Sequence, residues 1–358
     1  MSQSMKKQKL KAISPAKLIL AGEHAVLYGH PAIAVAVDRY AESCISNQIL
    51  PTIIFNFLNL DYAKSFTLQA LTLLKHRLRE QYHAFLHGQC NIREVLKMPF
   101  ELLQFAVSNL LEKLNIELPH GLEIHTSSNI PMGCGMGSSA ATVMSTLFAL
   151  AHFLKLDLDP NRFLTLGKEA ENLQHGRSSG IDLQLALQGG CIKFKEGKTE
   201  KKSPLQIPLS IVHTGTPLTT TGQCVAFTEP FFREGGLGDD FGSVAESLAL
   251  ALSEQAQSNQ DSTRNFTEIK RCVRENHQLL LRVGVVPDKV AAFIQSVEKL
   301  GGAAKICGAG AIAGENAGIV WIVGDEELKN SDEMQMLLQS YGYQMQVVQS
   351  DNHGTRIV

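Results

Sequence analysis

Residues 131–141 hold a proline, three glycines at alternate positions and a pair of serines. The glycines are Gly133, Gly135 and Gly137, and the serines are Ser138 and Ser139. Because glycine has no Cβ, the backbone there can take a positive φ and come close to a bound group. The free N–H groups at the start of a following helix, with the positive end of its dipole, would face the same space. The stretch therefore predicts a phosphate-binding loop.

The spacing of this loop matches neither of two common nucleotide motifs. No Gly-Lys-Ser or Gly-Lys-Thr follows the glycines, as a Walker loop requires, and the pattern is not Gly-x-Gly-x-x-Gly. The alternative is a glycine-rich connection whose small residues only let a helix pack closely on a sheet. The loop alone leaves both interpretations open.

Charged residues near the amino terminus could act beside such a loop. Lys17 lies in an apolar stretch that reads as a strand, and Glu23 and His24 lie in the loop that follows. The ordinary interpretations are a solvated charge at a strand end for the lysine and a polar surface residue for the histidine. These residues are candidates only in combination with other motifs.

Two carboxylates occur at the ends of predicted helices. Asp159-Pro160 is a helix-start signal, and the helix should end near residue 175 with Glu171 in its last turns. Negative charge near a helix carboxyl end is unfavourable, so Glu171 indicates either a solvated face or a bound cation. Asp182 falls in the first turn of the next helix, where the ordinary interpretation is a capping residue.

Composition restricts the class of protein. A chain of 358 residues with 44% hydrophobic residues, 19% charged residues and a formal charge of -2 predicts two domains of a soluble globular protein. That charge favours small-molecule partners over nucleic acid or membrane. Seven cysteines without a Cys-x-x-Cys pair indicate reduced thiols, and neither a signal peptide nor a membrane span is expected, so we expect a cytoplasmic protein.

Hydrophobic periodicity predicts a mixed α+β chain. In the first half the expected strands are 14–21, 31–37, 43–58, 65–71, 120–128 and 191–194, with a turn at 59–61. The expected helices are two within 71–114, then 138–154, 160–175 and a short one from about 181. A charged linker at 196–203 would divide domain 1–203 from domain 204–358.

The second half predicts an α+β sandwich. Expected strands are 209–213, 318–324 and 344–349, and expected helices are 243–256, 263–283 and 327–341, with a further segment at 287–300. Residues 235–242 are expected to be a surface loop. A third glycine cluster, 301–314, contains Gly308 and Gly310.

Three motifs in this order resemble those of the GHMP kinase superfamily, which includes galactokinase, homoserine kinase, mevalonate kinase and phosphomevalonate kinase. They are residues 17–29, the loop 131–141 and residues 305–310. Within the superfamily, Gly-Glu-His-Ala-Val-Leu-Tyr-Gly at 22–29 and His-Gly-Arg-Ser-Ser-Gly-Ile-Asp at 175–182 are most similar to the mevalonate kinases. The resemblance covers about residues 14–323. It implies two α+β domains, the first with a left-handed βαβ unit and the second a ferredoxin-like sandwich, with the active site in the cleft between them.

The resemblance also implies a reaction and its residues. The reaction is ATP-dependent phosphorylation of mevalonate to 5-phosphomevalonate, a step toward isoprenoid precursors, with Asp182 as the base and Lys17 beside it. Mg²⁺ would be held by Ser139 and Glu171. The implied ATP contacts are Ser128, Gly133, Cys134, Gly135, Met136, Gly137, Ser138 and Ser139. The implied substrate contacts are Glu23, His24 and Gly308. A homodimer is plausible from the family.

More than one function fits these motifs. Another kinase of the superfamily could act on phosphomevalonate or a related hydroxyl substrate, and Arg177 and Lys305 would then be the candidates to meet an extra phosphate. A sugar kinase and a non-catalytic small-molecule sensor on the same fold also fit. The sequence departs from the family at Ser178, where proline is usual, and at 311–316, where further glycines are usual. Contacts to the nucleotide base fall within 43–116, with Asn59 as a candidate.

Overall fold

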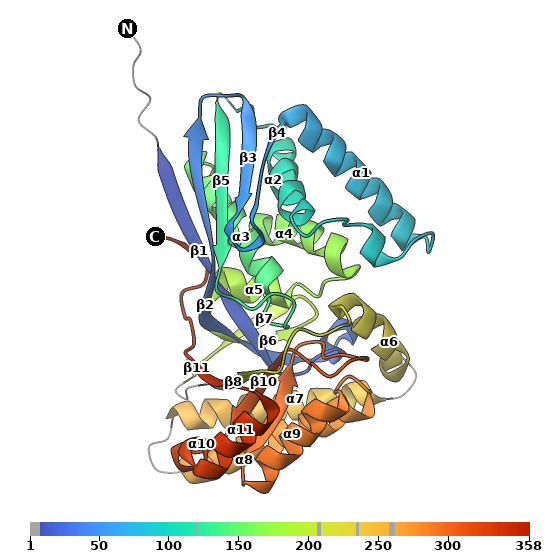
Figure 1. Ribbon diagram of the computed structural model, residues 1–358, viewed down its shortest axis with the longest axis vertical. Helices are drawn as coiled ribbons and strands as arrows, with labels where there is room; N and C mark the ends of the chain where they lie inside the picture. Colours follow the sequence, from blue (N-terminus) through green and yellow to red (C-terminus); the bar gives the residue numbers. More distant parts are fainter. Residues whose placement is uncertain (1–7, 119, 206–208, 234–235, 258–261) are drawn as a thin grey trace.

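The computed structural model describes residues 8–118, 120–205, 209–233, 236–257 and 262–358. The first residues of the basic amino-terminal segment and Gly235 lie outside the described residues. The described chain forms two sheets (Figure 1). Helices α1 to α4 lie on one side of the larger sheet, and the smaller sheet lies with helices α7 to α11 at the other end of the molecule.

The larger sheet carries the amino-terminal half of the chain. Its strands follow the order β12-β1-β2-β5-β3-β4, with β6 pairing to β2 and β7 to β6. β3 and β5 are parallel, and the segment that connects them contains β4, α1 and α2. The strands are β1 (Lys9–Ala21), β2 (Ala32–Gln48), β3 (Thr52–Phe57), β4 (Tyr62–Thr67), β5 (Gly121–Ser128), β6 (Cys191–Lys195), β7 (Lys198–Lys202) and β12 (Arg356–Ile357).

Strand β2 joins the predicted strand 31–37 to the first part of the predicted stretch 43–58, and the rest of that stretch forms β3. Residues 32–37 are buried on both faces, so they read as a continuous apolar run, whereas the burial alternates from Ala41 onward. The change of pattern reflects a change in what covers the strand, not a break in it. The predicted strand at 65–71 ends at Thr67, because the Thr67 side chain accepts a hydrogen bond from the N–H of Ala70 and caps α1.

The predicted helices of the first half are confirmed. They are α1 (Leu68–Leu86), α2 (Glu101–Lys113), α3 (Ser138–Phe153), α4 (Pro160–His175) and α5 (Ile181–Gln188). Asp159 caps α4, since its side chain accepts from the N–H of Arg162. The short 3-10 helix Leu58–Leu60 confirms the turn that was expected there.

The smaller sheet confirms the sandwich of the second half. Its antiparallel order is β11-β8-β10-β9. The strands are β8 (Leu209–His213), β9 (Ala303–Cys307), β10 (Ile319–Val323) and β11 (Met345–Val348). The helices are α6 (Thr221–Arg233), α7 (Leu237–Gln257), α8 (Ser262–Arg282), α9 (Asp288–Lys299), α10 (Glu326–Asn330) and α11 (Asp332–Tyr341).

Two predicted loops are wrong. The charged linker at 196–203 is mostly strand β7, which forms a hairpin with β6 across a turn at Glu196 and Gly197, both at positive φ. The surface loop at 235–242 gives way to α7 at Leu237, because Asp239 and Asp240 stand in the first turn, where carboxylates favour the helix. The division at residue 203 stays a prediction, and the last strand, β12, pairs with β1 in the larger sheet.

One apolar cluster spans both halves of the chain. It contains Leu18 of β1 and Val35 of β2 together with Phe241 of α7 and Trp321 of β10, all at most 1% exposed. Burial of such side chains is the main favourable term in folding, so this cluster fixes the smaller sheet against the strands that carry the amino-terminal motif. Among the described residues, no helix combines the length and apolar character that crossing a membrane requires.

Candidate functional site

Lys17 and Asp182 meet at the centre of the site. Lys17 lies in β1, and its backbone N–H donates to the Met136 carbonyl of the glycine loop at 3.0 Å. Its Nζ lies 3.3 Å from Oδ1 of Asp182, in the first turn of α5. The lysine side chain is 6% exposed and the aspartate 26%. A lysine so deeply buried requires a nearby negative charge, and Asp182 supplies it.

The glycine loop is shaped around this pair. Gly137 has a φ of +72° and caps the amino end of α3, and a Cβ there would lie 3.0 Å from Cγ of Lys17 and 3.3 Å from Oδ2 of Asp182. Only glycine combines that φ with that space. The free N–H groups at the start of α3 therefore lie directly beside the pair.

The third glycine cluster closes on the same loop. A Cβ on Gly135 would lie 2.5 Å from the Cys307 carbonyl oxygen, and one on Gly308 would lie 3.0 Å from Cα of Gly135. The two backbones therefore touch without side chains between them. This contact brings the end of β9, from the second half of the chain, to the phosphate-loop candidate.

Ser139 and Glu171 form a second polar pair beside the loop. The Ser139 hydroxyl donates to Oε1 of Glu171 at 2.8 Å, and Oε2 lies 3.6 Å from Nε2 of His175. Glu171 is 2% exposed, and burial raises the pKa of its carboxyl, with the charge of Asp182 acting in the same direction. A carboxylate held in this way would gain from a cation.

Glu23 is buried beneath the site. One of its oxygens forms an ion pair with Nζ of Lys305, and the other accepts from Nδ2 of Asn276 at 3.0 Å. Lys305 is wholly buried and also donates to the Ile19 carbonyl at 3.1 Å. The charge of Lys305 is thus balanced internally, which leaves it poorly suited to meet a substrate phosphate. Arg177, the other candidate, is exposed at the cavity.

His24 links the amino-terminal motif to the third cluster. Its φ of 56° is unusual for a residue with a side chain. Nε2 lies 3.1 Å from the Ala309 carbonyl, which can only accept, so we assign the ring proton to Nε2. Nδ1 then accepts from the Thr228 hydroxyl at 3.0 Å. Burial lowers the pKa of His24 to about 4, against a smaller raising effect of the Ala309 hydrogen bond, so the ring is neutral at pH 7.

A cavity of about 380 Å³ collects these side chains. Of the catalytic, ATP, metal and substrate residues that the resemblance implies, all except Ser128 line it. Those residues are Lys17, Glu23, His24, Gly133, Cys134, Gly135, Met136, Gly137, Ser138, Ser139, Glu171, Asp182 and Gly308. Ser128 instead lines a neighbouring cavity of about 450 Å³, which shares Gly133, Ser138 and Ser139 with the first.

Sequence reasoning missed a wall of the first cavity. Four threonines in the segment that leads into α6 line it: Thr216, Thr219, Thr220 and Thr221. The sequence signal for this wall was a run of threonines before an apolar stretch. The helical periodicity of that apolar stretch was too weak to predict α6. Asn276 in α8 was missed as well, because a helical pattern does not show that a polar residue forms hydrogen bonds with a loop distant in the sequence.

Ser178 compensates for the proline that is usual in the family. Its N–H donates to Oδ1 of Asn172 at 2.9 Å, and its hydroxyl accepts from the N–H of Gly180 at 3.2 Å. A proline has no N–H, so the first bond is possible only with another residue here. Two hydrogen bonds thus brace the turn that presents Asp182.

The sequence is similar to proteins of known families. The profile described as GHMP kinases N terminal domain matches residues 101–190, which include the glycine loop and Asp182. A mevalonate kinase of Pyrococcus furiosus is 29% identical over 308 residues, covering 84% of this chain and 86% of the relative. Residues 101–190 are therefore similar to the amino-terminal domain of the GHMP kinases, and most of the chain is similar to mevalonate kinases.

Solved structures confirm the fold. The mevalonate kinase of Methanococcus jannaschii superposes with a TM-score of 0.74 and 22% identity, covering 98% of this chain and 100% of the other. A Lactococcus lactis galactokinase with bound galactose gives a TM-score of 0.71 and 16% identity, with 98% and 95% covered. Both therefore share the two-domain GHMP kinase fold with this chain. The similar scores mean that the fold by itself does not select the substrate.

The buried histidines predict how stability depends on pH. Burial lowers the pKa of His277 to about 4 as well, assisted by the charge of Lys305. Between pH 6.5, the ordinary pKa of histidine, and about pH 4, these histidines bind protons in the unfolded chain but not in the folded chain. The free energy of unfolding therefore falls as the pH drops through that range. Each histidine contributes about 3 kcal/mol at most to this loss. Thermal denaturation at pH 7 and pH 5 should show it.

His24→Gln should flatten that dependence, because glutamine does not titrate. His83→Gln, at an exposed histidine on α1, is the matched control and should leave the dependence intact. An unchanged slope in His24→Gln would contradict the assignment of a neutral buried ring.

Proposed function

We propose that this protein transfers the γ-phosphoryl group of ATP to the 5-hydroxyl of mevalonate. The observation that carries the proposal is the pair Lys17 and Asp182, 3.3 Å apart in a cavity walled by the glycine loop. The similarity to mevalonate kinases over most of the chain supports the substrate. The pathway step would be the formation of 5-phosphomevalonate toward isoprenoid precursors.

Asp182 would act as the general base. Its carboxylate accepts the proton of the substrate hydroxyl as the oxygen attacks the phosphorus. Lys17 holds that carboxylate in place and stabilises the negative charge that develops on the attacking oxygen. Because phosphoryl transfer depends mainly on positioning and charge stabilisation, a fixed carboxylate and a fixed ammonium supply most of what the chain must provide on the substrate side.

The glycine loop would hold the phosphates. Residues 133–139, which include the amino end of α3, line the cavity, and their backbone N–H groups would donate to phosphate oxygens. The neighbouring cavity suits the nucleotide base, since apolar side chains including Phe57, Met98 and Leu102 line it. The side-chain amide of Asn59 there bonds the backbone of Ser128 at 2.6 and 3.0 Å, so it shapes this cavity.

Ser139 and Glu171 fit Mg²⁺. Both offer oxygen ligands, which Mg²⁺ prefers, and burial makes the lone carboxylate gain from a cation. Within the described residues no group of three or more His, Cys, Asp or Glu side chains is placed to hold a metal, and a site completed by waters and phosphates needs none. Bound Mg²⁺ would neutralise charge on the phosphates of ATP.

The substrate side would be formed by Glu23, His24 and Gly308. His24 borders the cavity as a neutral ring, and Glu23 supports the loop from beneath through Lys305 and Asn276. Because Lys305 is already paired, an additional substrate phosphate finds fewer cations here, which favours mevalonate over phosphomevalonate. We propose further that the protein acts in the cytoplasm on small molecules alone, without nucleic acid or membrane, and forms a homodimer.

Asp182→Asn tests the base. The amide cannot accept the proton as the carboxylate does, so kcat for mevalonate should fall by at least about a hundredfold. ADP release from Mg-ATP should be measured against mevalonate, phosphomevalonate, homoserine and galactose. If the wild type turned over another panel member instead, that compound would replace mevalonate as the assigned substrate. Full activity of the variant would contradict the assignment of Asp182 as the base. Nucleotide binding without turnover of any panel member would favour a sensor.

Glu171→Gln tests the metal ligand. The amide keeps the shape but loses the charge, so the Mg²⁺ concentration that gives half-maximal activity should rise by about tenfold or more. Glu169→Gln is the matched control, because Glu169 is two residues away and pairs with Lys113 instead. An equal effect of both substitutions would argue against Glu171 as a ligand.

A further inference from the structure

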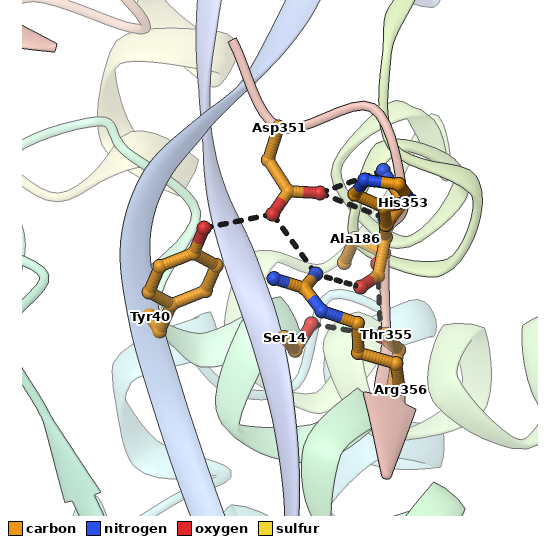
Figure 2. A network of polar contacts seen from close by, with 8 residues as sticks. Ser14, Tyr40, Ala186, Asp351, His353, Thr355 and Arg356 are labelled. Atoms are coloured by element: carbon orange, nitrogen blue, oxygen red, sulfur yellow. Dashed lines mark hydrogen bonds and ion pairs between the residues drawn. The ribbon is translucent and has the colours of Figure 1, made fainter. Parts of the chain in front are cut away.

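The end of the chain returns to the sheet that carries Lys17. We call residues 351–357 the C-terminal strap (Figure 2). At its start the Asp351 N–H donates to the Ala36 carbonyl at 2.9 Å, and the Asp351 carbonyl accepts from the Gly190 N–H at 2.6 Å. At its end β12 pairs with β1, with Ile357 opposite Ala12. The strap therefore lies between β1, β2 and the end of α5.

Asp351 holds the strap in one conformation. Its carboxylate accepts from the Tyr40 hydroxyl at 2.8 Å and from the N–H groups of His353 and Gly354 at 2.9 and 2.8 Å. It also pairs with Nη1 of Arg356 at 2.9 Å. Burial works to raise the pKa of Asp351, but these hydrogen bonds outweigh it and hold the pKa below its ordinary value. The turn is thus braced by a charged group that is 4% exposed.

Thr355 joins the strap to both elements of the central pair. Its hydroxyl lies 2.8 Å from the Ala186 carbonyl of α5 and 3.0 Å from the Ser14 hydroxyl of β1. A carbonyl can only accept, so Thr355 donates to Ala186 and accepts from Ser14. The Thr355 N–H donates to the same carbonyl at 2.8 Å. All three residues are at most 6% exposed.

Glycines on both sides make this approach possible. A Cβ on Gly354 would lie 2.3 Å from the Leu187 carbonyl oxygen, and a Cβ on Gly189 would lie 2.4 Å from the Gly354 nitrogen. Both residues have positive φ, at +68° and +66°. The strap is therefore fitted to the carboxyl end of α5, where the last carbonyls have no partner within the helix.

These contacts lie one helical turn from Asp182. Four residues of helix separate Ala186 from Asp182, about 6 Å along the axis, and Ser14 is three residues before Lys17 in β1. With eight residues, α5 is too short to be stable alone, so its position depends on what holds its ends. One threonine hydroxyl spans the two elements whose separation sets the distance from Lys17 to Asp182.

We propose that the C-terminal strap positions the base, with Thr355 as the positioning residue that fixes α5 against β1. The inference rests on the proposed function for its catalytic consequence. Its structural part, that the strap holds α5 in place, does not depend on which substrate the protein uses. Because misplacement of a catalytic group by about 1 Å can cost a hundredfold in rate, loosening α5 should lower kcat more than it weakens substrate binding.

Thr355→Val tests the hydroxyl at nearly constant shape. We expect hydrogen exchange at the amides of α5 to rise by about tenfold and kcat to fall by about tenfold, with the KM values for ATP and mevalonate little changed. Thr355→Ser keeps the hydroxyl and should restore both quantities. Asp351→Asn, which weakens the turn without touching α5, should produce a smaller change in the same direction.

Val348→Ala is the control for general destabilisation, because Val348 is buried in β11 of the smaller sheet. At a matched fall in melting temperature it should leave α5 exchange and kcat unchanged. Unaltered α5 exchange in Thr355→Val would overturn the proposal, and so would raised exchange with full kcat. A wild type without kinase activity would instead refute the proposed function, while α5 exchange would still decide whether the strap holds the helix.

Discussion

The contact between Lys17 and Asp182 is the constraint on which the site depends. A lysine with 6% of its side chain exposed is costly unless a negative charge stands beside it, and that partner comes from the first turn of a short helix 165 residues further along the chain. The glycine loop must then pass beside both residues without a side chain at Gly137. The ion pair thus holds β1, the glycine loop and α5 next to one another.

The second half of the chain supports this pair from two directions. From beneath, Lys305 of β9 pairs with Glu23 and so anchors the loop that leaves β1. From the side, the backbone around Gly308 touches Gly135 in the glycine loop. Both contacts come from β9 and the residue that follows it. The smaller sheet therefore acts on the geometry of the site as well as closing the cavity, and the shared apolar cluster keeps it in place.

The sequence predicted what local rules control. The capping aspartate before α4, the glycine loop before α3 and the alternating strand at 120–128 were all correct, because each follows from neighbouring residues. What failed depended on distant partners. Residues 196–203 look like a charged linker until β6 pairs with them, and Lys305 looks available until its burial beside Glu23 is known. The strap at the carboxyl end has no local signature, since its contacts are with Ala186 and Ser14, which are distant in the sequence.

A double-mutant cycle on kcat tests the central claim that Lys17 and Asp182 act as one unit. Lys17→Met, Asp182→Asn and the double variant should be compared with the wild type for ADP release with mevalonate. The account predicts that the double variant loses about as much as the worse single variant, because either change disables the same unit. Losses that multiply would show that the two residues act independently and would contradict the account.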